Sequence, residues 1–277
     1  MIVRSMPSRR SFLTLLAASP LLAVSGVRAQ APAMIFRPGS GYRFLPGGPV
    51  FAGGAVAEPG YEVVHAILTR WLPLEQGYAL VEGHLKSLGR PMQALCGMQL
   101  RLPRQLSADE FSEFNAPYVV RLKAWDLLYQ GLNPISRTNV SPALNAPREP
   151  SLHAFSYTVA SDRNAATFTM SGMTERGPGN SVIALGDVSP EGMQRKLAHV
   201  MSAVTGRLAE LGFDWHNATH VELYAAEEIP GAMAALAAKA TGALPRGVRW
   251  HYGRPPVVGL EVELEARAVA REVIVGG

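Results

Sequence analysis

Apolar positions recur along this chain with two spacings, and together they predict the same order of strands and helices twice. In the first half, apolar residues three and four positions apart indicate helices at 74–88 and 111–128. Runs of β-branched, aromatic and alternating apolar residues indicate strands at 42–45, 50–54, 62–72, 94–102, from about 137, and at 151–160. The turn residues between these runs agree with the divisions.

The second half repeats this order. Strands are expected at 166–173, 217–225, 250–252 and 260–269, and helices at 190–211 and 230–241. The strand at 260–269 alternates apolar residues with Glu261, Glu263 and Glu265. Its simplest interpretation is a strand with one buried and one solvated face, which we favour over a catalytic role for these glutamates.

This pattern predicts an α+β protein built from two tandem ββαβαβ domains, at residues 34–160 and 161–277, each a mixed sheet with its helices on one face. The composition fits a globular chain: 48% of the 277 residues are hydrophobic and 17% are charged. The single cysteine, Cys96, lies among apolar residues, so we expect a small buried side chain and no disulfide framework.

Residues 1–29 have the composition of an export signal. A basic start with Arg9 and Arg10 precedes a short apolar run at 13–24, and Ala29 follows at a position typical of cleavage. Paired arginines before Ser-Phe-Leu favour the twin-arginine type, and an ordinary secretory signal with a chance pair is the alternative. The run is short for a transmembrane helix. We therefore expect a periplasmic or secreted protein that has no membrane association after processing.

The positive charge of the chain is concentrated in this segment. The full chain carries a net charge of +4, and four of its 26 basic residues, with no acidic residue, lie in residues 1–29. The remainder is formally neutral, so a nucleic-acid partner is not expected.

The most informative stretch runs from Phe111 to Thr138. It predicts a helix, a turn at Asn133-Pro134 and a strand that begins near Arg137. A guanidinium fixed at a strand start can hold a carboxylate through two parallel hydrogen bonds. The alternative is an arginine with a purely structural role at the end of the sheet.

This stretch resembles the reactive-intermediate deaminases, the Rid or YjgF family. Phe111, Asn115 and Tyr118 match the family's Phe-x-x-x-Asn-x-x-Tyr helix, and Arg137 stands where the family carries its arginine. Tyr42 stands at the position of the family's Gly-Pro-Tyr tyrosine. The resemblance extends over both halves as a tandem pair.

The resemblance implies a chorismate-mutase-like fold and a homo-oligomer with sites at subunit or domain interfaces, here a trimer or a pseudo-hexameric ring. It also implies that the arginine holds the carboxylate of an imino or enamino acid, while a glutamate on the last strand positions or activates water. The products are a keto acid and ammonia. No cofactor is expected, because an imine carbon is already electrophilic.

Each half departs from the family pattern. The first half has Ala52 where the family has a serine, and its last strand lacks a glutamate, with His153 near that place. The second half has Glu263 at the glutamate position but lacks the asparagine helix motif, and Arg246 or Arg249 could correspond to its arginine.

We therefore predict a composite site, with Tyr42, Asn115 and Arg137 binding substrate, and Arg137 and Glu263 acting in catalysis. The predicted reaction is hydrolytic deamination of a small imino or enamino acid. The alternative is a non-catalytic protein that binds small carboxylate ligands at a degenerate site. Tyr42 and Asn115 could also be core and turn residues.

No metal site is expected. His216 and His220 are four residues apart, a spacing that suits a metal only on a helix, and here they fall on a loop and a strand.

Overall fold

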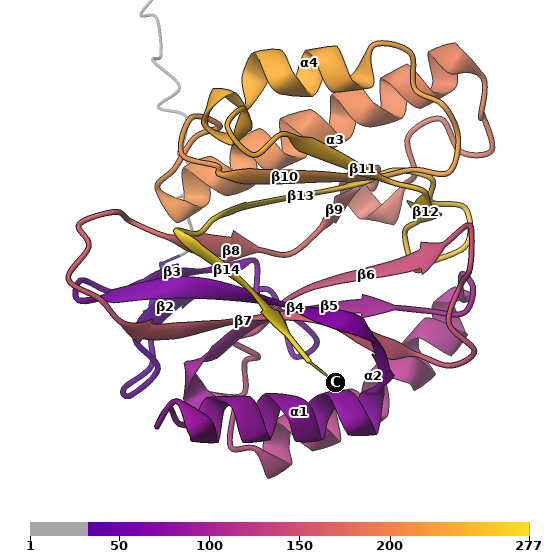
Figure 1. Ribbon diagram of the computed structural model, residues 1–277. Coiled ribbons are helices and arrows are strands. Elements are labelled where there is room, and N and C mark those ends of the chain that lie inside the picture. Colours follow the sequence, from indigo (N-terminus) through magenta and orange to yellow (C-terminus); the bar gives the residue numbers. More distant parts are fainter. Residues whose placement is uncertain (1–32, 277) are drawn as a thin grey trace, which may run out of the picture. The chain divides into compact units, whose positions relative to one another are not determined.

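The computed structural model describes residues 33–276 (Figure 1). The predicted export signal at 1–29 lies outside the described residues. The described part contains two β-sheets, four α-helices and three short 3-10 helices, at Met92–Ala94, Pro178–Asn180 and Thr241–Ala243. The predicted α+β class is confirmed.

The six-stranded sheet has the order β12-β6-β5-β7-β4-β14. Its strands are β4 (Tyr61–Pro73), β5 (Leu95–Arg101), β6 (Ser136–Pro142), β7 (Ser151–Ala160), β12 (Gly253–Arg254) and β14 (Arg271–Val275). Helices α1 (Leu74–Ser87) and α2 (Ala108–Ala124) pack their apolar faces on its outer side.

The eight-stranded sheet has the order β1-β2-β3-β8-β13-β10-β11, with β9 also paired to β13. Its strands are β1 (Ile35–Phe36), β2 (Tyr42–Leu45), β3 (Gly54–Ala57), β8 (Phe168–Met170), β9 (Met173–Thr174), β10 (His220–Tyr224), β11 (Val248–His251) and β13 (Glu263–Ala268). Helices α3 (Pro190–Leu211) and α4 (Ala232–Lys239) cover its outer side, so the two sheets face each other between pairs of helices (Figure 1).

The two sheets share one pairing pattern. In the order β6-β5-β7-β4, the first pair is parallel and the other two are antiparallel. The order β11-β10-β13-β8 has the same directions. The repeat of elements predicted along the sequence is therefore also a repeat of sheet topology.

Strands also cross between the halves. β2 and β3 come from the N-terminal half but extend the eight-stranded sheet through β8. β14 comes from the C-terminal end and pairs in parallel with β4. Each sheet therefore contains strands from both sides of residue 160, and a division of the chain there stays a prediction.

Local signals set the helix ends. Ser189 accepts a hydrogen bond from the Gly192 amide at the start of α3, and Gly212 ends that helix with a φ of 86°. The predicted bounds of 190–211 agree with the structure. Helix α2 starts three residues earlier than predicted because Ser107 and Glu110 form a capping box, which the apolar pattern does not reveal.

The prediction of a solvated glutamate face on the last strand of the repeat is wrong. Glu263, Glu265 and Arg267 are 3%, 2% and 0% exposed. The opposite sheet covers this face, and its polar side chains pair with the charges. The alternation of apolar and charged residues along β13 therefore reflects two buried faces of the strand, one in an apolar and one in a polar environment.

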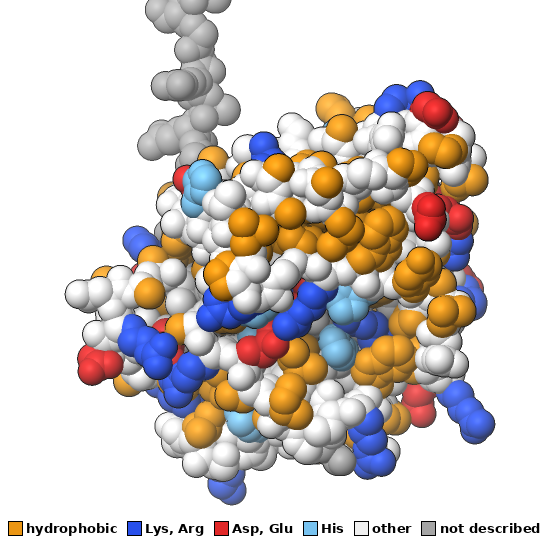
Figure 2. All heavy atoms as spheres, turned by 45° about the horizontal axis from the view of Figure 1, so that its top comes forward, with side chains coloured by type: hydrophobic (Ala, Val, Ile, Leu, Met, Phe, Trp, Pro, Cys, Tyr) orange, Lys and Arg blue, Asp and Glu red, His pale blue; other side chains and the backbone are white. Residues whose placement is uncertain are grey.

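The surface combines charged and apolar regions. Figure 2 shows apolar side chains gathered in a band on one face, next to a mixed cluster of basic, acidic and histidine side chains. Large apolar side chains that are more than half exposed include Tyr252, Val258 and Ile274.

Cys96 is buried, as predicted. No helix within residues 33–276 has the length and apolar content needed to cross a bilayer.

Candidate active site

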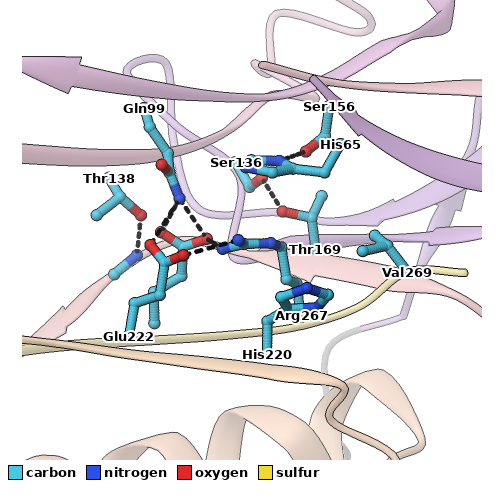
Figure 3. Close-up of polar contacts among 12 residues, drawn as sticks. His65, Gln99, Ser136, Thr138, Ser156, Thr169, His220, Glu222, Arg267 and Val269 are labelled. Carbon is cyan, nitrogen blue, oxygen red and sulfur yellow. Dashed lines mark hydrogen bonds and ion pairs between the residues drawn. The ribbon is translucent and has the colours of Figure 1, made fainter. Parts of the chain in front are cut away.

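Strand β6 is fixed against the other sheet by hydrogen bonds that flank Arg137. The Arg137 amide donates to Ser171 Oγ at 2.8 Å, and Ser171 Oγ donates to the Ala52 carbonyl at 2.6 Å. The Gly172 amide donates to Thr138 Oγ1 at 3.1 Å, a contact drawn at Thr138 in Figure 3. These bonds fix the backbone of Arg137 relative to residues 171–172 of the second half.

The guanidinium of Arg137 is buried in a polar and aromatic setting. Its Nη2 donates to Asn115 Oδ1. With the Asn139 amide turned so that its oxygen faces Arg137, Nε and Nη2 also donate to Asn139 at 3.2 and 3.1 Å. The guanidinium carbon lies 4.5 Å from the centre of the Tyr118 ring.

These contacts leave one part of the guanidinium free. Nη1 of Arg137 is buried and has no hydrogen-bond partner among the described residues. Burial lowers the pKa of Arg137, although an arginine remains charged at neutral pH. The two-bond fork expected from the sequence is thus partly occupied by Asn115 and Asn139, and Nη1 is the donor that remains for a ligand.

Glu263 reaches the same region from β13. Its carboxyl lies over Gly172, where an added Cβ would come 1.9 Å from Oε1. Its Oε2 is buried without a hydrogen-bond partner in the described part of the chain. Burial, followed by the charge of Glu265, raises the pKa of Glu263 well above its ordinary value, although Arg101 and Arg137 act in the opposite direction. Burial therefore favours the protonated form of this carboxyl relative to that of an exposed glutamate.

One pocket of about 180 Å³ contains both groups. Residues from both halves line it, and its walls combine polar and apolar side chains. The lining residues are Phe51, Phe111, Arg137, Asn139, Gly172, Thr174, Arg176, Pro256, Val257, Leu260 and Glu263. The structure thus brings Arg137 and Glu263 together across the two sheets, with Asn115 behind the guanidinium.

Tyr42 is not part of this pocket. Its side chain is fully buried, and its hydroxyl donates to the Leu95 carbonyl at 2.7 Å. Burial raises the pKa of Tyr42 well above its ordinary value. Tyr42 therefore lies in a buried apolar cluster with its hydroxyl already bonded, which matches the core position that the sequence left open as the alternative.

The other basic candidates also lie elsewhere. Arg249 forms ion pairs with Glu222 and Glu272 at 3.4 and 3.0 Å, and Arg246 is exposed. Neither lines the pocket around Arg137. His153 is also outside it, and burial lowers the pKa of its imidazole well below the ordinary value.

A buried charged layer lies beside Glu263 on the same face of β13. Arg267 contacts Glu222 at 2.7 Å and Glu265 at 3.2 Å, and Gln99 from the opposite sheet donates to Glu265 at 2.9 Å (Figure 3). In a low-dielectric interior these contacts hold the strand in one position. They therefore fix Glu263, two residues before Glu265.

His216 and His220 have separate partners. His216 Nδ1 contacts Thr241 Oγ1, whereas His220 contacts Thr219 and Glu272. Within residues 33–276, no group of three or more His, Cys, Asp or Glu side chains is placed to hold a metal ion.

Asn139 and Arg176 are among the pocket residues that were not singled out from the sequence. Asn139 lies two positions after Arg137 on the same strand, so the period-two rule places both side chains on one face and could have found it. Arg176 follows the short strand β9 in a segment without a regular pattern, and no sequence signal marks it.

The chain is similar to several known proteins. Among solved structures it resembles a chorismatase, with 14% identity, a TM-score of 0.43 and coverage of 83% of this chain and 77% of that chain. It also resembles the Rid protein YyfB from Yersinia pestis, with 15% identity, a TM-score of 0.29 and coverage of 40% and 83%. These structural likenesses are low.

Sequence similarity is much stronger. The chain is 36% identical over 250 residues to 2-amino-5-chloromuconate deaminase of Comamonas testosteroni, which covers 87% of this chain and 98% of that protein. Residues 34–273 match the family described as 2-aminomuconate deaminase CnbZ. On this match over most of its length, the chain belongs to the CnbZ family.

Proposed function

We propose that this protein is a hydrolytic deaminase that releases ammonia from a 2-aminomuconate-type substrate, an unsaturated amino dicarboxylate. Membership of the CnbZ family and the named activity of its 36%-identical relative support the substrate class. The observation that carries the mechanism is the shared pocket of Arg137 and Glu263, each with a buried polar atom that lacks a partner.

Arg137 binds the carboxylate next to the amino-bearing carbon. Its free Nη1 donates to this carboxylate, and the bond is strong because it is charge-assisted and largely removed from water. Asn115 and Asn139 hold the guanidinium in place, so the substrate does not have to order it. The contact between Arg137 and the carboxylate orients the substrate, so that its amino-bearing carbon lies beside Glu263.

Glu263 transfers protons in both directions. The neutral carboxyl first donates its proton to a carbon of the enamine, which becomes an iminium ion, and Glu263 becomes a carboxylate. The carboxylate then removes a proton from the water whose oxygen adds to the iminium carbon. The proton passes to the amino nitrogen, the carbon–nitrogen bond breaks, ammonia leaves, and the carbinol hydroxyl loses its proton to restore neutral Glu263.

The net change is one water consumed and one ammonia released, with a carbonyl in place of the amino group. No step oxidises or reduces the substrate. A carboxyl with a raised pKa suits this cycle, because it holds a proton at the start and can regain it at the end.

The direct test is ammonia release from freshly generated 2-aminomuconate, with the product identified by mass spectrometry. One ammonia per substrate is expected from the wild type, and Arg137→Ala should remove the activity. Arg70→Ala is the matched control, since Arg70 is exposed and does not line the pocket. Carboxylate binding without ammonia release in the wild type would reject the deaminase and favour the non-catalytic binder.

We also propose that the protein works as a homo-oligomer, a trimer or a pseudo-hexameric ring. The exposed apolar side chains and the apolar band in Figure 2 support association. A groove of about 450 Å³ lined by Trp250, Tyr252 and residues 228–234 adds apolar surface beside β11, at the edge of its sheet. Sedimentation equilibrium should give a mass of three chains, and a monomer at micromolar concentration would contradict the proposal.

We propose that residues 1–29 export the protein through the twin-arginine route. Replacement of Arg9 and Arg10 by lysines should keep the protein in the cytoplasm, because that route depends on the arginine pair. Unchanged export of the lysine variant would instead indicate an ordinary secretory signal.

A further inference from the structure

We infer that Arg176 is a specificity-determining residue that binds the second carboxylate of a dicarboxylate substrate, in the same pocket as Arg137. This inference rests on the proposed function and assigns a role to a residue that the mechanism above does not use. Arg176 lines the same pocket as Arg137 and Glu263.

The setting of Arg176 leaves its guanidinium available. Its backbone is held by a bridge to Val182 and by a 2.9 Å contact between its carbonyl and His199 Nε2. Its side chain is exposed, and its guanidinium makes no ion pair with the residues that the structure describes. The position is thus fixed while the charged group remains free for a ligand.

The charges of the pocket suit a dianion. Arg137 and Arg176 contribute two positive charges, and Glu263 is the one acidic residue among the described residues that line the pocket. A ligand with one carboxylate would use Arg137 and leave Arg176 in water. A ligand with two carboxylates would pair both groups.

The pocket walls suit the part of the ligand between the two carboxylates. Phe111, Val257 and Leu260 contribute apolar surface. An unpaired carboxylate against such surface would lose hydration without compensation, whereas a hydrocarbon chain would be stabilised there. A volume of about 180 Å³ leaves room for a short hydrocarbon chain.

The test compares two inert ligands with the same six-carbon diene chain. Muconate has a carboxylate at each end, and sorbate has a carboxylate at one end and a methyl group at the other. Neither has an amino group, so calorimetric titration measures binding alone. The wild type should bind muconate about tenfold more tightly than sorbate, and the preference should shrink at high salt because Arg176 is exposed.

Substitutions at Arg176 and Arg137 distinguish the two proposed carboxylate contacts. Arg176→Ala should lower the muconate preference to within about threefold and leave sorbate affinity unchanged, and Arg176→Gln should behave alike. Arg137→Ala should weaken both ligands, and Arg70→Ala should weaken neither. Because Arg176 is exposed, circular dichroism should show an unchanged fold in its variants.

The inference is overturned if the wild type binds neither ligand or does not prefer muconate. It is also overturned if Arg176→Ala retains the preference or weakens both ligands equally. Failure of the proposed deaminase activity is a separate result: it would appear as absent ammonia release while the muconate preference and its dependence on Arg176 remain.

Discussion

Arg137 and Glu263 line one pocket, although their strands belong to different sheets, and Nη1 of Arg137 and Oε2 of Glu263 are both buried without a partner among the described residues. An unpaired buried polar group costs about 1–3 kcal/mol. Native proteins rarely keep such groups without a reason, and a ligand with a carboxylate and an adjacent amino group could pair with both. The placement of these two groups at one pocket leads to the following predictions.

Replacement of Arg137 by lysine keeps the charge and removes the planar group. The Asn115 and Asn139 amides each lose a donor, and an ammonium cannot reproduce the geometry of Nη1. We expect kcat/KM for ammonia release to fall by about 100-fold, as for a misplaced binding group. Arg70→Lys is the control, and activity of Arg137→Lys within threefold of wild type would contradict the role of the fork.

Gly172→Ala tests the position of Glu263 without changing a functional group. The new Cβ would meet Glu263 Oε1 at 1.9 Å and push the carboxyl aside. Activity should fall by about 10- to 100-fold while the fold remains intact, because a displacement of about 1 Å can have such an effect.

Gly206→Ala is the matched control for this substitution. An added Cβ at Gly206 in α3 meets no atom within 4 Å, so activity should stay at the wild-type level and helix stability should rise by up to about 1 kcal/mol. Equal activity in the Gly172 and Gly206 variants would show that Glu263 tolerates displacement.

Glu263→Gln should change how stability depends on pH. Burial raises the folded-state pKa of Glu263 above the ordinary 4.5, so the folded protein retains a proton that the unfolded chain releases. The contribution of Glu263 to the free energy of unfolding is fully present below about pH 4.5, and it is lost as pH rises toward the folded-state pKa. Urea unfolding should therefore show the glutamine variant gaining stability relative to wild type between pH 5 and pH 8. A constant difference across this range would mean that the carboxyl is not perturbed.

Arg267→Met tests the buried charged layer that Arg267 forms with Glu222 and Glu265. The substitution leaves Glu222 and Glu265 buried without their cation, and loss of one partner from a buried ion pair typically costs about 3–5 kcal/mol. Guanidinium unfolding measures the change. Arg195→Met removes an exposed ion pair to Asp187 and should leave stability near wild type. Similar stability in the two variants would contradict a structural role for the layer.

The sequence predicts the helices and the order of the strands well, because these depend on local spacing and end signals. Helix α3 illustrates this, since Ser189 and Gly212 mark both of its ends. The resemblance of the stretch between Phe111 and Arg137 to the Rid family likewise predicted a deaminase. This prediction agrees with the name of the CnbZ family.

Features that depend on the packing of distant segments were not predicted. The burial of Glu265 and Arg267 follows from the facing sheet, whose Gln99 completes the network, and alternation along one strand cannot distinguish such a face from a solvated one. Strand β14 was missed because its partner β4 lies about two hundred residues earlier. Arg176 was missed because it lies in an irregular segment.

Proton transfer by Glu263 is tested most directly by measuring Glu263→Gln in two ways, by ammonia release from 2-aminomuconate and by binding of muconate. Glutamine fits the same space but cannot transfer protons. The variant should therefore bind muconate within about threefold of wild type and release ammonia at no more than about 1% of the wild-type kcat. A variant that retains more than half of the wild-type kcat would contradict the assignment of proton transfer to Glu263.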